Sequence, residues 1–347
     1  MIQTADIYMN RCIELASMAN GYVAPNPMVG AVLVYNDTII GEGYHEKYGK
    51  PHAEVNCINS VSAENKHLIS VSTLYVSLEP CAHYGKTPPC ANLIIENKIP
   101  NVVIGCRDPF AAVNGRGIAM LQDAGVKVTM SVIENKCTLL NKRFFTFHKY
   151  KRPYIILKWA QTSNGMMATK SNQRLLISND TTNVLVHKWR SEEAAIMVGS
   201  STAIKDNPQL GNRLYSGHQP LRLVLDRGLK IDMNSKVLDG IQSTVVFNNI
   251  IQKKQGNTLF QLLSEHKPVI EQVLEFCCKN GIQSILVEGG STLLQLFING
   301  NYWDEARVIT NKELFISEGL QSPVLNKKLL NHEEHYLSDV ISYYTPE

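Results

Sequence analysis

The sequence has no long apolar run, no strong charge of either sign and few aromatic residues. No stretch approaches the roughly 18 apolar residues that span a membrane. The first twenty residues lack the basic start and apolar block of a signal peptide. The net charge of +3 is too small for nucleic acid to be the main partner. We therefore expect a cytoplasmic protein that binds neither a membrane nor nucleic acid, and whose eight cysteines are kept reduced.

Two blocks of alternating strands and helices divide the chain. A length of 347 residues allows two domains, each with its own core. Short apolar runs predict strands at 31–37, 73–80, 101–106, 126–130, 154–160, 194–199, 221–226, 244–249 and 284–290. Between them, helical patterns cover 3–20, a segment near 52, 90–98, 115–125, 180–190, 268–280 and 291–300. This alternation predicts layered α/β domains at 1–146 and 152–347, joined by a solvated linker at the basic run of 148–153.

A histidine and a glutamate two positions apart open the first helix of interest, in the stretch "PHAEVNCINS". On a regular helix such residues point to roughly opposite sides. Pro51 is typical of a helix start, so we predict that His52 and Glu54 both lie in a first turn that faces a pocket.

Two cysteines follow in "PCAHYGKTPPC" and complete a metal-binding set with the histidine. His52, Cys81 and Cys90 offer one imidazole and two thiolates, which zinc favours. Three protein ligands leave a fourth tetrahedral position for water, so we predict one catalytic zinc per chain. Glu54 would not bind the metal but would carry the water's proton to the nitrogen being expelled.

Two other interpretations of these residues stay open. Scattered cysteines are often buried hydrophobic residues, and a structural zinc site would take a fourth ligand, His83 or His45. The order of the motifs favours a catalytic site, because H-x-E followed by P-C-x-x-C is typical of zinc deaminases. Here eight residues, rather than two, separate Cys81 from Cys90.

The stretch "LEPCAHYGKTPPC", with "APNPMVG" before it and "RDPF…NGRG" after it, resembles the deaminase half of the bifunctional riboflavin-biosynthesis deaminase/reductase. The resemblance implies a cytidine-deaminase-like α/β/α domain. Its substrate would be a diaminohydroxypyrimidine bearing a phosphoribosylamino group. It also implies a pocket for that substrate, lined by Asn26, His45, His83 and Lys86. Phe110 departs from the family, which usually has asparagine there.

The second half has no G-x-G-x-x-G fingerprint, but "VEGGSTLL" leads from a strand into a helix whose free N–H groups suit a phosphate. The stretch "STAIKDNPQLGNR" resembles the reductase half of the same family, which is similar to dihydrofolate reductase in fold and uses NADPH. The resemblance implies cofactor contacts from Ala160, Leu176, Thr202, Asp206, Gly290, Ser291 and Thr292. It implies that the deaminated intermediate is held by Lys158, Arg174, Arg190, Leu210, Arg213 and Glu288.

Three departures mark this half. Ser163-Asn164-Gly165 follows Thr162 where the family usually has "SLDG", Arg174 replaces a serine, and Leu176 replaces a tryptophan. One alternative is therefore a deaminase whose C-terminal half is only a scaffold for dimerisation. A nucleic-acid base editor is disfavoured by the near-neutral charge and the reductase-like half. We expect a two-step enzyme that acts on a small molecule and forms a homo-oligomer.

Overall fold

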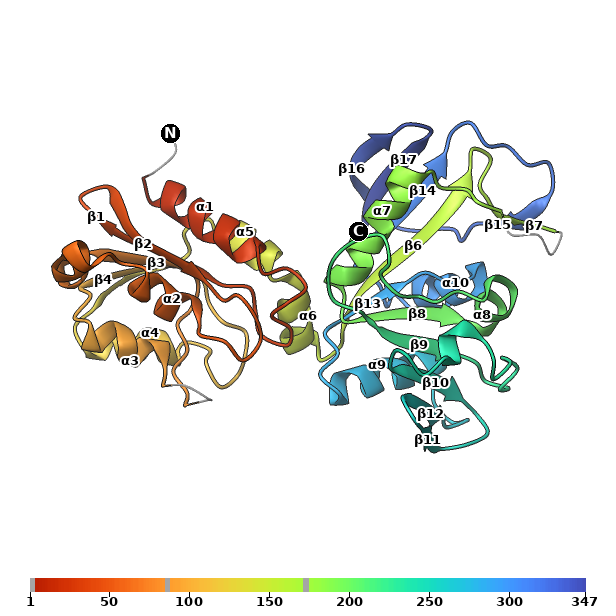
Figure 1. Ribbon diagram of the computed structural model, residues 1–347, viewed down its shortest axis with the longest axis horizontal. Helices are drawn as coiled ribbons and strands as arrows, with labels where there is room; N and C mark the ends of the chain where they lie inside the picture. Colours follow the sequence, from red (N-terminus) through yellow and green to blue (C-terminus); the bar gives the residue numbers. More distant parts are fainter. Residues whose placement is uncertain (1–3, 85–87, 171–174) are drawn as a thin grey trace. The chain divides into compact units, whose positions relative to one another are not determined.

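The computed structural model describes residues 4–84, 88–170 and 175–347. It divides into two compact units, Met1–Lys151 and Arg152–Glu347, and each is described by itself (Figure 1). None of the helices in these ranges has both the length and the apolar character needed to cross a membrane.

The first unit is built on one five-stranded sheet in the order β2-β1-β3-β4-β5. Pairs β1–β2 and β1–β3 are antiparallel, and β3–β4 and β4–β5 are parallel. The strands are β1 (Gly30–Tyr35), β2 (Thr38–Tyr44), β3 (Thr73–Leu78), β4 (Asn101–Cys106) and β5 (Lys127–Thr129). The helices are α1 (Thr4–Ser17), α2 (Ala53–Asn59), the 3₁₀ helix η1 (Ala63–Val71), α3 (Cys90–Glu96), α4 (Arg116–Asp123), α5 (Glu134–Leu140) and α6 (Lys142–Tyr150).

Helices cover both faces of this sheet because its central strands are apolar on both sides. Along β1, Ala31 and Leu33 join the core beneath α2, α3 and α4. The alternate residues Val32 and Val34 join the core beneath α1, α5 and α6. The result is the α/β/α layering predicted from the sequence.

The first unit extends beyond residue 146, where the predicted domain ended. Helix α6 continues to Tyr150, because Phe144 and Phe145 bury its inner face, and His148 packs on Phe144 with ring centroids 4.3 Å apart. Most of the basic run at 148–153 is thus the end of a helix or directly follows it, rather than an extended linker.

The second unit contains a ten-stranded sheet in the order β11-β12-β10-β9-β8-β13-β6-β14-β17-β16 and a separate β15–β7 pair. The seven neighbouring strands β12-β10-β9-β8-β13-β6-β14 all pair in parallel. The outer strands β11, β17 and β16 pair with their neighbours in antiparallel fashion. The strands are β6 (Tyr154–Thr162), β7 (Met166–Thr169), β8 (Ala195–Gly199), β9 (Leu221–Leu225), β10 (Thr244–Asn248), β11 (Lys253–Gln255), β12 (Thr258–Leu262), β13 (Ser284–Val287), β14 (Glu305–Asn311), β15 (Gly319–Gln321), β16 (Lys328–Tyr336) and β17 (Asp339–Pro346).

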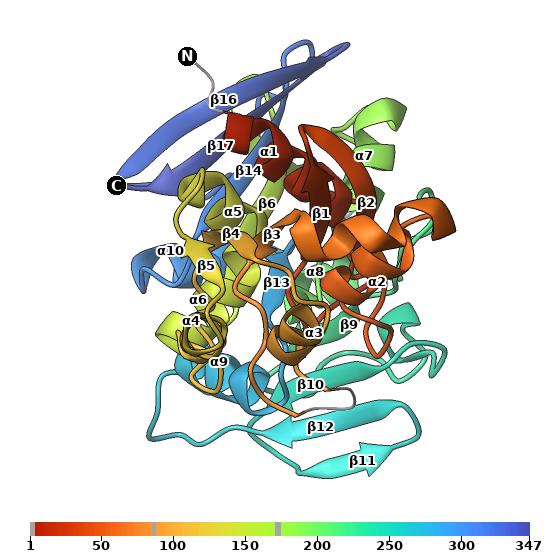
Figure 2. The same cartoon turned by 90° about the vertical axis from the view of Figure 1, so that its left-hand side faces the viewer.

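Helices pack on both faces of this second sheet as well. They are α7 (Asp180–Glu192), α8 (Ser200–Asp206), α9 (Val269–Lys279) and α10 (Ser291–Asn299), with a short 3₁₀ helix η2 (Lys236–Leu238). Ile155 and Leu157 of β6 pack with α9 and α10, whereas Tyr154 and Ile156 pack with α7. The long β16–β17 hairpin, coloured dark blue in Figure 2, closes one edge of the sheet.

Candidate active sites

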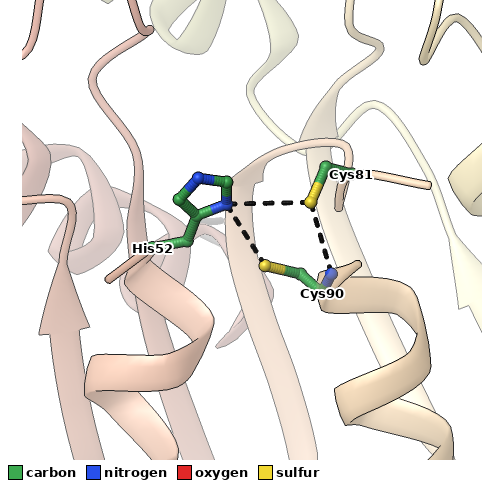
Figure 3. A group of neighbouring side chains, drawn as sticks. All are labelled: His52, Cys81 and Cys90. Carbon is green, nitrogen blue, oxygen red and sulfur yellow. Dashed lines mark hydrogen bonds between the residues drawn. The ribbon is translucent and has the colours of Figure 1, made fainter. Parts of the chain in front are cut away.

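Two cysteines and one histidine meet where three elements of the first unit begin or end. His52 precedes α2, Cys81 follows β3, and Cys90 is the first residue of α3. The ligand atoms of these three residues lie within 4.8 Å of one another (Figure 3). Nδ1 of His52 is 3.7 Å from Sγ of Cys81 and 3.4 Å from Sγ of Cys90. The chain therefore brings together the set of ligands predicted from its sequence.

The local backbone explains how His52 and Glu54 serve one site. His52 is the N-cap of α2 and has an extended backbone, with φ −74° and ψ 167°. It is not part of the helix, so the wide angle between helical positions i and i+2 does not apply. The prediction that both residues lie in the first turn was therefore wrong for His52, and Glu54 alone is helical.

Burial and neighbouring charges shift the acidity of these groups. The pKa of Cys81 is lowered by a hydrogen bond from the Cys90 thiol and then by the bond to His52, while the pKa of Cys90 is raised. The backbone N–H of Cys90 also donates to Sγ of Cys81 at 3.3 Å. Glu54 is only 3% exposed, and its pKa is raised by burial and then by Cys81. One sulfur is thus prepared as a thiolate ligand beside a carboxyl group that can hold a proton.

A buried charge cluster occupies the second unit. Glu288, directly after β13, accepts hydrogen bonds from Nε and Nη2 of Arg190 on α7, both at 2.7 Å. Nζ of Lys158 on β6 lies 3.8 Å from the same carboxylate. Burial alone raises the pKa of Glu288, but the charges of Arg190 and Lys158 lower it to about 2. Two residues that the resemblance assigned to the intermediate, Arg190 and Lys158, therefore both contact a third, Glu288.

Known proteins resemble both units. Residues 2–106 match the family model of the cytidine and deoxycytidylate deaminase zinc-binding region, and residues 153–312 match that of the RibD C-terminal domain. Riboflavin biosynthesis protein RibD of Aquifex aeolicus (strain VF5) is 36% identical over 321 residues, covering 90% of this chain and 88% of the relative. RibD of Bacillus amyloliquefaciens is 38% identical over 309 residues, covering 86% of this chain and 82% of the relative. The chain belongs to the RibD family.

Solved structures agree over the whole length. The deaminase/reductase of Thermotoga maritima has a TM-score of 0.90 and 34% identity, and the match covers 99% of both chains. Acinetobacter baumannii RibD, form 1, has a TM-score of 0.90 and 29% identity over 100% of both chains. RibD membership confirms the predicted order of the domains, a deaminase domain followed by a reductase domain. It also confirms the predicted activities, a zinc-dependent deaminase and an NADPH-dependent reductase. It favours the two-step enzyme over the scaffold alternative.

Two other residues predicted for the RibD deaminase site, His45 and Asn26, lie on the His52 side of the metal ligands. His45 places its ring 5.3 Å from that of His52. Nδ1 of His45 donates to the carbonyl of Pro51 at 3.0 Å, so Nε2 accepts from Nδ2 of Asn26 at 3.1 Å. Because both ring nitrogens are engaged, His45 is not a fourth metal ligand.

The remaining deaminase residues are more exposed or outside the described ranges. His83 is exposed, contacts the ring of Phe110 and lies outside the group of ligand atoms. A closed site with four protein ligands is thus not formed by the described residues. Lys86, also predicted to bind substrate, lies outside them.

Two groups of predicted cofactor contacts lie close together in the RibD reductase unit. Thr202 and Asp206 lie on α8, and Gly290, Ser291 and Thr292 start α10. These helices follow β8 and β13, which are neighbouring parallel strands, so both helices start at the same edge of the sheet. A Cβ atom on Gly290 (φ +45°) would lie 3.2 Å from Oγ1 of Thr202, which shows how closely the two helix starts approach.

The other predicted cofactor residues are spread more widely. Ala160 lies on β6 opposite Ile309 of β14. Leu176 is 72% exposed. Arg174 lies outside the described residues. The departure at Asn164 is accommodated, because its side chain accepts from Oγ1 of Thr162 at 2.7 Å and donates to the carbonyl of Ile316 at 2.8 Å.

His187 lies beside the charge cluster but was not predicted from the sequence. Its Nδ1 accepts the backbone N–H of Arg213 at 2.9 Å, and Nη1 of Arg190, one turn later on α7, donates to the carbonyl of Gly211 at 3.1 Å. The two side chains thereby hold the loop that carries Leu210 and Arg213. Burial, and then the charges of Arg190 and Arg213, lower the pKa of His187 to about 4. Its spacing of three from Arg190 on a helix was the available signal.

Proposed function

We propose that this chain catalyses two successive steps of riboflavin biosynthesis. The first is hydrolytic deamination of 2,5-diamino-6-(5-phosphoribosylamino)pyrimidin-4-one, and the second is NADPH-dependent reduction of the ribosyl group to ribityl. The observation that carries the proposal is the presence of both sites in one chain that aligns end to end with a relative described as a deaminase/reductase.

For the first step, His52, Cys81 and Cys90 would hold zinc, and two sulfurs with one imidazole nitrogen fit that ion. When bound, zinc supplies a Lewis acid that makes water nucleophilic at neutral pH. Glu54 takes the proton of the attacking water and delivers it to the leaving nitrogen, so that water is added and ammonia departs. Its raised pKa suits a group that must both accept and release a proton.

The substrate pocket of the first unit would be completed by four side chains. The hydrogen bond from Asn26 to His45 fixes both residues beside the metal ligands. From this position they can contact the pyrimidine ring. We assign His83 and Lys86 to the ribose-phosphate end, where the exposure of His83 leaves it accessible to a ligand.

For the second step, NADPH supplies the hydride. The starts of α8 and α10 would hold its phosphates through Thr202 and the N–H groups of Ser291 and Thr292, with Asp206, Ala160, Leu176 and Gly290 as further contacts. Lys158 would lie near the sugar carbon that receives the hydride. Its side chain is only 13% exposed, and burial lowers its pKa.

The intermediate would be bound by the charge cluster and the adjoining loop. Arg190 directs three of its nitrogens to Glu288 and Gly211, so its main task is to hold Glu288 in its ionised form. Arg213 is exposed at the same loop, which makes it the better partner for the phosphate. Leu210 and Arg174 are assigned to the same ligand.

The organisation of the enzyme is part of the proposal. We assign the deaminase to residues 1–146, extended through α6, and the reductase to residues 152–347. The eight free cysteines support a reducing cytoplasm. The exposed leucines at 329 and 330 on the edge strand β16 support a homo-oligomer.

The decisive experiment measures the two reactions separately with the purified full-length chain. Given the aminopyrimidine without NADPH, it should release ammonia and accumulate the deaminated intermediate. Given that intermediate, it should oxidise NADPH without releasing ammonia. Ammonia release with no oxidation of NADPH on the intermediate would leave only the deaminase-with-scaffold alternative.

A further inference from the structure

One buried carboxylate near the metal ligands has no part in the mechanism above. Glu79 follows β3, lies two residues before Cys81 and is 4% exposed. Its Oε2 accepts the backbone N–H groups of Asp108 at 3.3 Å and Gly115 at 2.9 Å. Its Oε1 accepts those of Gly117 at 3.1 Å and Ile118 at 3.4 Å. Four donors thus converge on one side chain.

The need for this carboxylate comes from the start of α4. The N-cap of that helix is Gly115, whose φ of +88° favours glycine and which has no side chain to cap the helix. The N–H groups of Gly117 and Ile118 therefore lack an intrahelical partner. Glu79, the residue after β3, supplies the missing acceptor, and its negative charge also suits the N-terminus of α4.

The contact between α4 and the segment leading to Cys81 is tight. A Cβ atom on Gly117 would lie 2.0 Å from the carbonyl oxygen of Pro80. The same four bonds anchor the loop that includes Phe110, whose ring lies 6.1 Å from that of His83. The "RDPF…NGRG" motif is therefore folded around a residue adjacent to the metal-ligand segment.

We propose that Glu79 is a positioning residue for deamination, which sets the place of Cys81 by fixing its segment to the start of α4. This inference rests on the proposed zinc-dependent function. On its other side, the Cys81 segment is bonded to α3, whose Ala91 N–H donates to the Cys81 carbonyl at 3.2 Å. With Glu79 unable to accept these bonds, the Cys81 segment loses its attachment to α4, and we expect the sulfur to shift relative to His52 and Cys90.

The isosteric change Glu79→Gln distinguishes a carboxylate that is needed as a hydrogen-bond acceptor from a side chain that only fills space. Glutamine keeps the volume, but its amide nitrogen faces two N–H donors and cannot accept from them. A residue that only fills space tolerates this change. A residue that must accept four bonds does not.

The experiment uses the zinc-loaded full-length chain and measures zinc transfer to a chelator in the absence of substrate. We expect Glu79→Gln to weaken zinc binding about 10- to 100-fold, which is typical when a group that supports a metal ligand is lost. In the Co²⁺-substituted protein, the thiolate-to-metal absorption band should shift as well. Val102→Ala is the control, because it destabilises the same unit from the far end of β4 without touching the Cys81 segment.

A second variant covers the case in which Glu79→Gln fails to fold. Gly117→Ala keeps every hydrogen-bonding group and pushes directly on Pro80, so it should also weaken zinc binding and shift the Co²⁺ band. The proposal is overturned if the folded Glu79→Gln or Gly117→Ala protein retains wild-type zinc affinity while only its melting temperature falls, as for Val102→Ala. A wild-type chain that binds no zinc would instead overturn the proposed function.

Discussion

The two sites of this chain handle charge in opposite ways. The first gathers two sulfurs and an imidazole from three elements of the unit, a set of ligands that suits a cation. The second balances Glu288 with Arg190 and Lys158 from within the chain. Removal of a ligand from the first site should therefore abolish metal binding. Removal of a charged partner from the second site should instead lower the stability of the fold.

The strongest test of this contrast removes a metal ligand. Cys81→Ala or Cys90→Ser should abolish zinc binding and ammonia release, because only two of the three predicted ligands remain and they are too few to hold the ion. The variants should still oxidise NADPH on the deaminated intermediate, since the second unit has its own core. Elemental analysis and the two separate assays provide the measurement. Deamination by a metal-free preparation would contradict the zinc mechanism.

The next test separates the proton carrier from the ligands. Glu54→Gln should keep its zinc and lose about 10²- to 10⁴-fold in deamination rate, the range typical of general acid–base catalysis. Zinc content and turnover are measured on the same sample. If zinc is lost together with activity, Glu54 is a ligand and the assigned roles are wrong.

In the second unit, Arg190→Ala should destabilise the fold by about 3–5 kcal/mol, because it leaves a buried carboxylate with only Lys158 as partner. Chemical denaturation followed by far-UV circular dichroism measures this change. Lys170→Ala is the matched control, since the Lys170–Glu318 pair is about 70% exposed on both sides and should contribute less than about 1 kcal/mol. Equal effects from the two variants would remove the contrast between the sites.

Acid should weaken the second unit through His187. Its pKa is about 4 in the folded chain, below the ordinary value of 6.5, because burial and the charges of Arg190, Arg213 and Lys158 oppose protonation, while Glu288 only partly offsets them. The unfolded chain therefore binds the proton first, so stability is complete above pH 6.5 and falls as the pH drops from 6.5 towards 4. Unfolding of His187→Gln should lose this part of the pH dependence. An unchanged profile would show that His187 does not titrate on unfolding.

The smallest expected effect concerns the exposed Leu176. Leu176→Trp restores the family's residue and should tighten NADPH binding by roughly three- to tenfold, the gain typical of one aromatic contact. A fluorescence titration of the full-length chain with NADPH measures it. Unchanged affinity would show that the departure at 176 does not limit cofactor binding.

Sequence patterns predicted most of the buried strands but missed β14, whose first five residues are buried, and the strand β2. This strand reads "TIIGEGY", and glycine weakens a strand pattern. The structure explains both glycines, because a Cβ atom at Gly41 would lie 2.6 Å from the carbonyl oxygen of Cys57, and one at Gly43 would lie 2.3 Å from its nitrogen. Helix α2 can pack this closely only against glycine, and glycine weakens the sequence pattern by which a strand is predicted.

The site residues show the same division. The metal ligands were predicted because their types and order carry the chemistry, whereas the bond between Arg190 and Glu288 joins residues 98 positions apart and leaves no local pattern. The strands after residue 300 were also missed. The edge strand β16 is exposed along most of its length, so its sequence lacks an apolar face.

The position of the metal ligands at element boundaries also bears on how the chain matures. His52, Cys81 and Cys90 come together only when β3 has paired with β1 and β4, and with α2 and α3 formed beside it. During synthesis, therefore, both thiols emerge from the ribosome before any high-affinity site exists. Zinc can be captured only after β4, which ends at Cys106, has emerged and paired with β3, and until then the two thiols depend on the redox state of their surroundings for protection.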